Sequence, residues 1–596
     1  MTDERHEDED LLGKEDESPA AHMGDADEDV SCDSEVKREE DYIERPVEED
    51  LSGAVYAGAV DASGVAGDVI EGLEAGGQAR RAELSGNLKG RSLLGQIYVL
   101  AVWPFFELLG ISFVGLVDIA LSGRLGGMQS ARALDSVGVA AYVTWLIAML
   151  FAAVGVGAGA LVARAIGGKN RVDANRVLGQ AIMMGVVWGS LIGFALWMTA
   201  PLFGRLFNLQ GETLDLCTLY LRILSLATPV NAVVALGTAA LRSAGDTRTP
   251  FIAIMVINVV NIFASWLLTF GPEPWGGHGV GGIAGGTAIS WVVGGLLIAV
   301  ILIRGQGPDF ISWTRWEKYL AGDRRMLSSR HAISIRQGNP LAIKAWMPVR
   351  VRLSRLPIKL RLRWMMPNGE LMWRIIKIGI PSLIESGGMW FGNLLIAGIV
   401  GGLGVWGVEE VVDGVMGAHV VGIRIESLSF LPGMAIGISA ATLVGQYLGL
   451  GDKHRAKQAA ILSWLIGSSA MGIIGLSFIF LPGAYVGLLV TSQDAQAEMV
   501  RELATPLLVV AGFTQFFFGT YIVISQSLRG AGETIGPMVL TYASTFLIRL
   551  PAAYVIGVAL GYGLTGIWVG LCAEIVIRAC LFMGWFQMGR WERIKV

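Results

Sequence analysis

Long runs of apolar residues without a charged side chain recur along most of this 596-residue chain. Runs that contain no Asp, Glu, Lys or Arg at all include 137–163, 177–204, 249–271, 280–303, 459–490 and 505–528. Each is longer than the roughly 20 residues that a helix needs to cross a bilayer. A buried helix of a soluble protein rarely runs so far without a polar face. The pattern therefore predicts membrane-spanning helices.

Runs that are interrupted by single charged residues raise the expected number of spans to twelve. They are expected at about 95–122, 137–165, 177–203, 214–240, 249–271, 280–303, 375–404, 415–448, 459–489, 503–527, 537–560 and 564–588. All should be helices, because lipid offers no partner to an unpaired backbone group. The predicted fold class is an all-α integral membrane protein with 12 transmembrane helices in two six-helix lobes.

A duplicated segment supports the division into two lobes. Leu241–Pro250 (LRSAGDTRTP) and Leu528–Pro537 (LRGAGETIGP) lie 287 positions apart and share six of ten residues, and each lies between two long apolar runs. A weaker match relates 161–167 to 443–449. Halves with an even number of helices repeat in the same orientation, as in carriers whose lobes are related by a pseudo-two-fold axis along the membrane normal.

Charge divides the chain further. Only 16% of the residues are charged, whereas about 25% are charged in a typical soluble protein. Residues 1–90 hold 27 acidic and 8 basic residues, a net charge of −19, within a chain whose overall net charge is −5. A segment with so much charge buries too little apolar area on folding to offset the conformational entropy that it would lose. We therefore expect an acidic, largely disordered cytoplasmic tail at 1–90, an N-terminal lobe at 91–304, a basic cytoplasmic linker at 305–370 and a C-terminal lobe at 371–596.

The loops predict the orientation. Those after spans 2, 4, 8 and 10 carry ten Lys and Arg residues, and the loops on the other side carry four. Basic loops stay in the cytoplasm, which predicts a multi-pass protein of the cell (inner or plasma) membrane with both termini cytoplasmic. The linker alternates basic and apolar residues over 349–364. It is expected to be either a solvated linker or a segment that lies on anionic lipid.

Ionisable side chains within the spans are few, and such groups are costly in lipid and usually functional. Glu107 and Asp118 share the first span and are eleven residues apart, so they face the same way at about 16 Å. Asp118 is near its helix end, where the helix dipole disfavours a carboxylate unless H+, a cation or an arginine such as Arg222 compensates. Asn258 and Asn261, one turn apart, either join helices or coordinate a cation.

The second lobe has ionisable groups of its own. Glu385 in the seventh span aligns with Glu107 in the first, 278 positions earlier. Glu574 and Arg578 are spaced i, i+4 in the last span, and this spacing lets them pair on one helix. We expect the latter two to form a structural ion pair.

Several segments resemble the multidrug and toxic compound extrusion (MATE) family. They are 116–123 (LVDIALSG) in the first span, Leu241–Pro250 with its copy, and 432–446 in the eighth span. The resemblance covers about 91–304 and 370–590. It implies a V-shaped pair of six-helix lobes and efflux of organic, often cationic, compounds in exchange for H+ or Na+. The implied partners are a small-molecule substrate and the lipid bilayer, with no nucleic acid and no cofactor besides the coupling ion; a monomer is expected.

The resemblance also implies a site. Asp118 matches the first-span aspartate that takes part in cation coupling. Related bacterial members add an asparagine in the fifth span and an aspartate four residues later; here Asn261 fits and Ser265 replaces the acid. Other members place a glutamate where this chain has Met389, one turn from Glu385. The expected cation-coupling or substrate residues are Asp118, Asn258, Asn261, Glu107, Ser290 and Glu385, and Na+ is expected at Asp118 and Asn261 if it is the coupling ion.

Two other functions are possible alternatives to export. A lipid-linked glycan flippase, a related two-lobed carrier, would line its cavity with basic groups, for which Arg222, Arg424 and Arg549 are the candidates. An intramembrane enzyme has no supporting motif: His-Glu-x-x-His is absent, and the GxGxxG pattern at 561–566 follows no soluble strand. The four cysteines show no metal or disulfide spacing. We expect a secondary active efflux transporter and not an enzyme.

Overall fold

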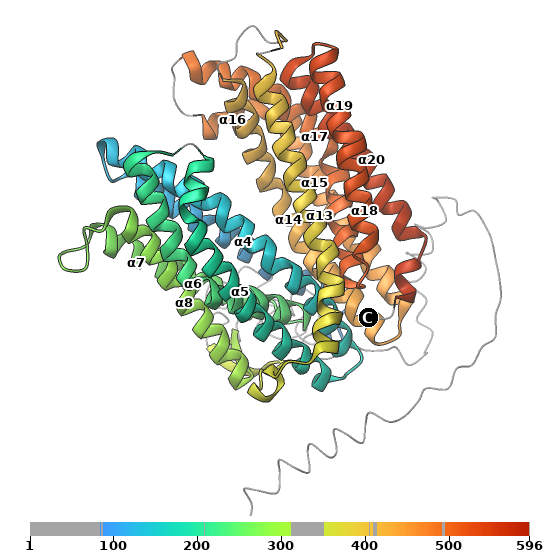
Figure 1. Cartoon of the computed structure of the whole chain (residues 1–596). Coiled ribbons are helices and arrows are strands. Elements are labelled where there is room, and N and C mark those ends of the chain that lie inside the picture. Colours follow the sequence, from blue (N-terminus) through green and yellow to red (C-terminus); the bar gives the residue numbers. More distant parts are fainter. Residues whose placement is uncertain are drawn as a thin grey trace, which may run out of the picture. The chain divides into compact units, whose positions relative to one another are not determined.

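The computed structural model of the chain describes Leu84 and residues 88–310 and 351–594, apart from 208, 405, 409–413 and 491–494. Within this part, 12 helices are long and apolar enough to cross a membrane, and they confirm the twelve predicted spans (Figure 1). Most of the predicted acidic tail lies outside the described residues. Leu84 and Leu88, which that prediction assigned to the tail, are buried against the helices.

The first lobe consists of α3 (Leu93–Gly123), α4 (Gly127–Gly167), α5 (Arg171–Leu206), α6 (Gly211–Ser243), α7 (Arg248–Phe270) and α8 (Gly279–Arg304). Helices extend beyond the apolar runs because hydropathy marks only the part that lipid surrounds. The clearest case is α4, which begins at Gly127, although its apolar run begins at Val137.

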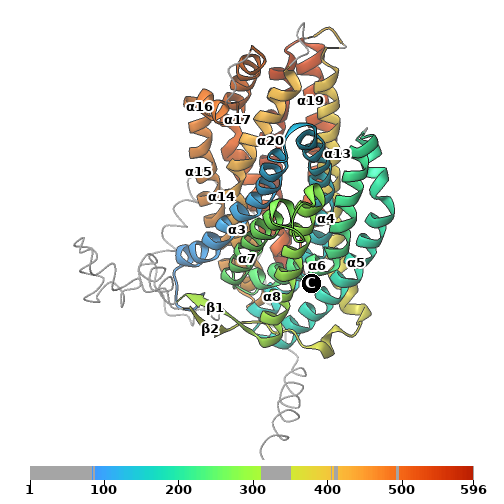
Figure 2. The same ribbon diagram turned by 90° about the vertical axis from the view of Figure 1, so that its left-hand side faces the viewer.

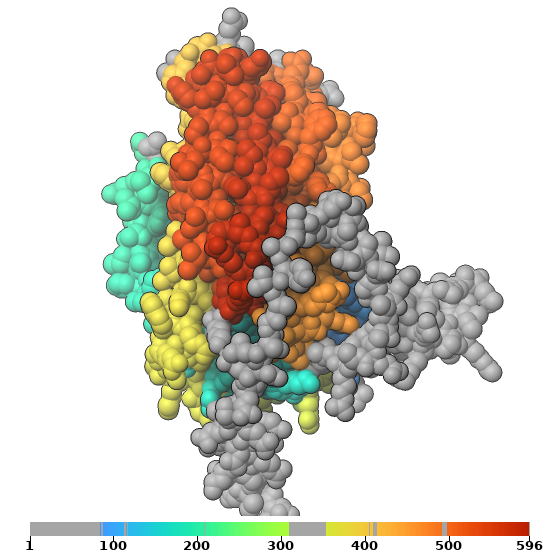
Figure 3. Space-filling view, turned by 90° about the vertical axis from the view of Figure 1, so that its right-hand side faces the viewer, coloured from blue at the N-terminus to red at the C-terminus, as the bar shows by residue number. Residues whose placement is uncertain are grey.

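The second lobe consists of α13 (Gly369–Gly402), α14 (Val415–Gly449), α15 (Lys453–Phe480), α16 (Pro482–Leu489), α17 (Ala495–Gly530), α18 (Ile535–Ser544), α19 (Leu550–Tyr554) and α20 (Gly563–Gln587), with a final 3-10 turn, η5 (Arg590–Arg593). The ninth span was predicted as one helix over 459–489. The structure divides it at Leu481, because Pro482 has no N–H to donate and begins a new helix. In Figure 3, α13 (yellow) lies beside the helices of residues 535–587 (red).

Two π-helical turns interrupt the eleventh span. They are η3 (Thr545–Arg549), between α18 and α19, and η4 (Val555–Ala559), after α19. A π turn inserts one extra residue into a helical turn and is found most often at functional positions. Here the first π turn contains Arg549, the buried arginine of this span.

The ends of the linker form a two-stranded antiparallel ribbon, in which β1 (Gln306–Phe310) pairs with β2 (Val351–Arg355) (Figure 2). The alternation of basic and apolar residues there is thus the two-residue period of a strand. The following turn, η2 (Leu362–Met365), is attached to α5, since the amide of Gln180 donates to the carbonyls of Trp364 and Met366 at 2.7 and 2.6 Å. Residues 311–350 of the predicted linker lie outside the described residues.

Small residues allow close helix packing within each lobe. On α5, a Cβ at Gly193 would lie 2.5 Å from the Ser225 carbonyl oxygen of α6, and one at Gly189 would lie 3.0 Å from Pro229. Between the lobes, α4 packs against α13 and α14, and α3 packs against α14. We use "basic end" for the end of the helices with the loops 168–170, 244–247, 450–452 and 531–534.

Candidate functional site

Asp118 is buried in the first lobe, with 5% of its surface exposed, on the last turns of α3. Its Oδ2 accepts a hydrogen bond from the hydroxyl of Tyr220 on α6 at 2.9 Å. It accepts a second from the hydroxyl of Thr287 on α8 at 3.1 Å. Three helices therefore meet at one carboxylate, and both donors are neutral.

Asn261 on α7 completes the group. Its amide Nδ2 donates to Thr287 Oγ1 at 2.9 Å and lies 3.4 Å from Ser265 Oγ. Its carbonyl oxygen, Oδ1, is buried and has no hydrogen-bond donor among the described residues. Asn261 and Asp118 thus share Thr287, as expected for one site. We call the four residues Asp118, Tyr220, Asn261 and Thr287 the Asp118 cluster.

Arg222 is not the partner of Asp118. Its guanidinium lies over the ring of Trp197 on α5, 5.5 Å from the ring centre. Tyr220 and Arg222 are two residues apart on α6, so they point about 200° apart around the helix, and only one of them faces α3. Among the described residues no arginine, lysine or histidine forms an ion pair with Asp118. The expectation that a buried arginine compensates Asp118 is wrong for Arg222.

Two further first-lobe candidates, Asn258 and Ser290, lie beside the cluster and donate to backbone carbonyls. Asn258 Nδ2 donates to the carbonyl of Gly110 at 2.9 Å and joins α7 to α3, while its Oδ1 is buried and accepts no hydrogen bond from the part of the chain that the structure describes. Ser290 donates to the backbone carbonyl of Thr287 at 2.7 Å, on the next turn of α8. Asn258 thus lies one turn from Asn261 on α7, and Ser290 lies one turn from Thr287 on α8.

Glu107 and Glu385 are not part of the Asp118 cluster. Glu107 forms a buried ion pair with Arg242 at the end of α6. Glu385 forms the equivalent pair with Arg529 at the end of α17, with 2.9 Å between Oε2 and the guanidinium. Both pairs lie near the basic end, one in each lobe, and they leave the coupling role predicted for these glutamates untested.

The second lobe holds a buried charge cluster of a different kind. The predicted pair of Glu574 and Arg578 forms at 2.6 Å, and Arg549 binds the other carboxylate oxygen of Glu574 at 3.0 Å. Arg578 also donates to Ser544 and Thr545, and these two bonds are 2.9 and 2.8 Å long. The carboxylate is thus held between two arginines from the π-helical span and from α20.

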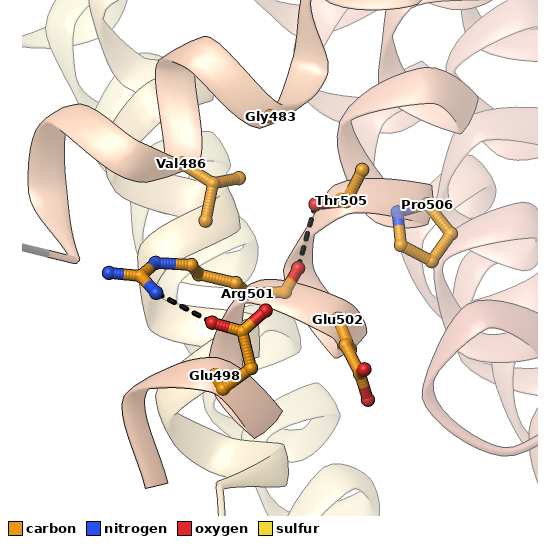
Figure 4. A pocket seen from close by; sticks show the side chains of 7 residues that line it. All are labelled: Gly483, Val486, Glu498, Arg501, Glu502, Thr505 and Pro506. Atoms are coloured by element: carbon orange, nitrogen blue, oxygen red, sulfur yellow. Dashed lines mark hydrogen bonds and ion pairs between the residues drawn. The ribbon is translucent and has the colours of Figure 1, made fainter. Parts of the chain in front are cut away.

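A pocket of about 450 Å³ lies elsewhere, between α16 and the first turns of α17 (Figure 4). Glu498, Arg501 and Glu502 line it, and Arg501 donates to Glu498 at 2.7 Å. This pocket is in the second lobe and contains no residue of the Asp118 cluster.

The oxygen atoms of the Asp118 cluster could hold a small cation. A buried carboxylate is costly unless it is protonated, paired or bound to a cation, and here it has two neutral donors. The spare Oδ1 of Asn261 and the hydroxyl oxygens of Tyr220 and Thr287 are the hard oxygen ligands that suit Na+. Sequence reasoning missed Tyr220 and Thr287, because other hydroxyl side chains lie in the same spans and no pattern in the sequence distinguishes these two.

Comparisons with known proteins agree with this architecture. The MatE family model matches residues 105–267 and 381–555, more than half of the chain. The chain is 26% identical over 482 residues to the probable multidrug resistance protein NorM of Thermotoga maritima, which covers 81% of this chain and 89% of that protein. It is 23% identical over 501 residues to the uncharacterized transporter YisQ of Bacillus subtilis, with coverages of 82% and 94%.

A solved structure described as the outward-facing conformation of a multidrug resistance MATE family transporter has the same fold. It superimposes with a TM-score of 0.67 at 19% identity, and the match covers 84% of this chain and 96% of that one. The family match, the relatives and the twelve apolar helices agree with one another. The chain therefore belongs to the MatE family of multi-pass membrane transporters.

Proposed function

We propose that this protein is a secondary active exporter of organic, often cationic, compounds, driven by exchange for H+ or Na+ at Asp118. The observation that carries the proposal is the Asp118 carboxylate, buried with two neutral hydrogen-bond donors and without an ion pair among the described residues. The family membership supports export of small molecules, since the relative in Thermotoga maritima is named a probable multidrug resistance protein.

The Asp118 cluster can couple ion binding to lobe movement. Its members come from α3, α6, α7 and α8. A cation that binds there therefore contacts four helices of one lobe. A ligand shifts an equilibrium between two arrangements only by its difference in affinity for them. We infer that the outward arrangement takes up the ion, that the substrate leaves outward, and that release of the ion inside resets the cycle.

The distribution of basic loops orients this cycle. Arg164, Lys169 and Arg171 flank one loop at the basic end, and Arg242 and Arg529 flank two others. Basic loops are retained in the cytoplasm, so the basic end is the cytoplasmic end and Asp118, near the opposite end of α3, lies towards the outside. Both termini are then cytoplasmic.

The test is export of a cationic dye, ethidium, from vesicles that contain the purified full-length protein. An imposed pH gradient and then an imposed Na+ gradient are applied separately, and dye movement is followed by fluorescence. We expect one gradient to drive transport and Asp118→Asn to reduce it to the rate of protein-free vesicles. Asp135→Asn, which changes an exposed aspartate outside this cluster, should transport normally. Gradient-driven transport by Asp118→Asn would disprove the role of Asp118.

The flippase alternative gains no support from the arginines that motivated it. Arg549 is already bound to Glu574 within the second lobe, Arg222 lies against Trp197, and Arg424 is exposed. A pyrophosphate site needs several basic groups that converge on one point. These three arginines have separate surroundings, and we do not carry this function further.

A further inference from the structure

The two lobes contact each other crosswise at the basic end. Arg164, at the end of α4, donates through one terminal nitrogen to the carbonyl of Ala531 in the loop after α17, at 2.8 Å. Gln446, at the end of α14, donates to the carbonyl of Ser243 at the end of α6, at 3.1 Å. Arg164 and Gln446 are the equivalent residues of the two repeats, 282 positions apart. Each lobe therefore extends a side chain to the other lobe's loop.

The same crossing continues along the helices. A Cβ at Gly167 would overlap the backbone of Gln446, and a Cβ at Gly449 would overlap the backbone of Arg164. These two glycines are also equivalent in the repeat. Further from the loops, the hydroxyl of Ser439 on α14 donates to the carbonyl of Ile97 on α3 at 3.2 Å. Contacts this close form only when the lobes meet at the basic end.

The loops that accept these hydrogen bonds are themselves held by buried ion pairs. Arg242 immediately precedes Ser243 and binds Glu107 of α3. Arg529 lies two residues before Ala531 and binds Glu385 of α13 at 2.9 Å. Both glutamates are almost fully buried, with 2% and 0% of their surfaces exposed. Each pair ties the accepting loop to the first helix of its own lobe.

We propose that these contacts form a reciprocal latch that holds the basic end closed. In the latch, Arg164 and Gln446 bind the opposite lobe, and the ion pairs of Glu107 and Glu385 position the two accepting loops. Opening of the basic end requires that both crosswise hydrogen bonds break. The inference rests on the proposed function to the extent that a two-lobed exporter must open at each end in turn.

The two arms of the latch differ in strength. Arg164 is charged and also donates to the carbonyl of Ile594 at 2.6 Å, whereas Gln446 is neutral and makes one bond to the opposite lobe. Hydrogen bonds from charged donors contribute roughly twice as much as neutral ones. The loss of Arg164 should therefore favour the open arrangement more than the loss of Gln446.

The test measures the distance between the lobes directly. Spin labels are attached at Arg171→Cys and His454→Cys, two exposed positions at the basic end of different lobes, in a full-length chain with Cys32→Ser and Cys580→Ser. Distance distributions are recorded by pulsed electron paramagnetic resonance without any ion gradient. We expect Arg164→Ala to increase the longer-distance population about tenfold, which corresponds to about 1.4 kcal/mol, and Gln446→Ala to increase it less.

Arg176→Ala is the matched control, because Arg176 lies on α5 near the same end and its ion pair, with Asp173 at 3.9 Å, is at the surface. It should leave the distribution unchanged. If Arg164→Ala does not fold, Arg164→Lys keeps the charge, reaches one carbonyl at most, and should give an intermediate increase. An unchanged distribution in folded Arg164→Ala or Arg164→Lys overturns the latch.

The positioning role of the glutamates needs a variant that leaves no unpaired buried charge. In Glu107→Gln with Arg242→Gln, both charges are removed together, and we expect the longer-distance population to increase because the loop of Ser243 loses its anchor. An unchanged distribution would limit the latch to Arg164 and Gln446. The distance measurement does not depend on transport. Gradient-driven export by Asp118→Asn would therefore overturn the proposed function alone, and an unchanged distance distribution in folded Arg164→Ala would overturn the latch alone.

Discussion

The two lobes share a fold and an equivalent buried ion pair, Glu107 with Arg242 and Glu385 with Arg529, but they differ in how a further buried carboxylate is compensated. In the first lobe, Asp118 has neutral donors and no ion pair among the described residues. The equivalent position in the second lobe, 278 residues later, is Ile396, which is 2% exposed and packed in an apolar core. The second lobe instead holds Glu574 between two arginines.

This difference concerns how the charge of each buried carboxylate is compensated. A carboxylate held between two guanidiniums is already compensated and has no free bonding capacity for an external cation. A carboxylate with neutral donors is left to be compensated from outside, by a proton or a cation. On the proposed function, Asp118 in the first lobe exchanges ions, whereas Glu574 in the second lobe keeps a fixed pairing with two arginines.

The contrast between the lobes predicts different outcomes when a buried carboxylate is replaced by an amide in each lobe. Glu574→Gln leaves Arg549 and Arg578 buried without their carboxylate, and breaking a buried pair in this way costs about 3–5 kcal/mol. We expect the variant to lose that much free energy of unfolding, measured by thermal or denaturant unfolding in detergent. Asp118→Asn should remain within about 1 kcal/mol of the unaltered protein, because an amide can keep neutral hydrogen bonds. Equal destabilisation of the two variants would contradict the distinction.

Variants of the two asparagines of α7 distinguish Na+ from H+ as the coupling ion. If Na+ binds the Asp118 cluster, Asn261→Ala removes the spare carbonyl ligand and should raise the Na+ concentration for half-maximal transport roughly tenfold, about 1.4 kcal/mol. Asn258→Ala removes a buried spare oxygen that lies outside the cluster. This variant should change the Na+ concentration for half-maximal transport much less. Transport that follows only the pH gradient, with equal effects of both variants, would assign the coupling to H+.

The smallest expected effect concerns Asp246, in the loop of the duplicated segment. Its side chain caps α7, since Oδ1 accepts the N–H groups of Arg248 and Thr249 at 3.1 and 3.2 Å. Burial raises the pKa of this carboxyl above its usual value, although the hydrogen bonds from Thr249 oppose the shift. The folded protein therefore binds this proton more tightly than the unfolded chain does.

That contribution to stability is present below the unfolded pKa of about 4 and is lost as the pH rises through the raised pKa of the folded state. Asp246→Asn keeps the Oδ1 acceptor and removes the titration. We expect the variant to match the unaltered protein within about 1 kcal/mol and to lack its loss of stability over this pH window. Parallel unfolding midpoints across the window would contradict the assignment.

The sequence predicted two residues of the site but not the partners of its ionisable side chains. Asp118 and Asn261 were predicted as one site, and the structure joins them through Thr287. Glu107 was predicted in the same functional set, on the same helix face, but the structure binds it to Arg242. Spacing along one helix orders the side chains on that helix and says nothing about which residue of a neighbouring helix stands opposite.

The sequence alone determined the twelve spans, their division into two repeats and the position of the charge-bearing residues, because lipid forces apolar runs of fixed length into helices. Only the tertiary structure decided the partners: Tyr220 and not Arg222 for Asp118, arginine pairs for Glu107 and Glu385, and the crosswise contacts of Arg164 and Gln446. The physical reason is that a helix presents its residues about 100° apart. Which face meets a neighbour depends on packing between helices that are far apart in the chain.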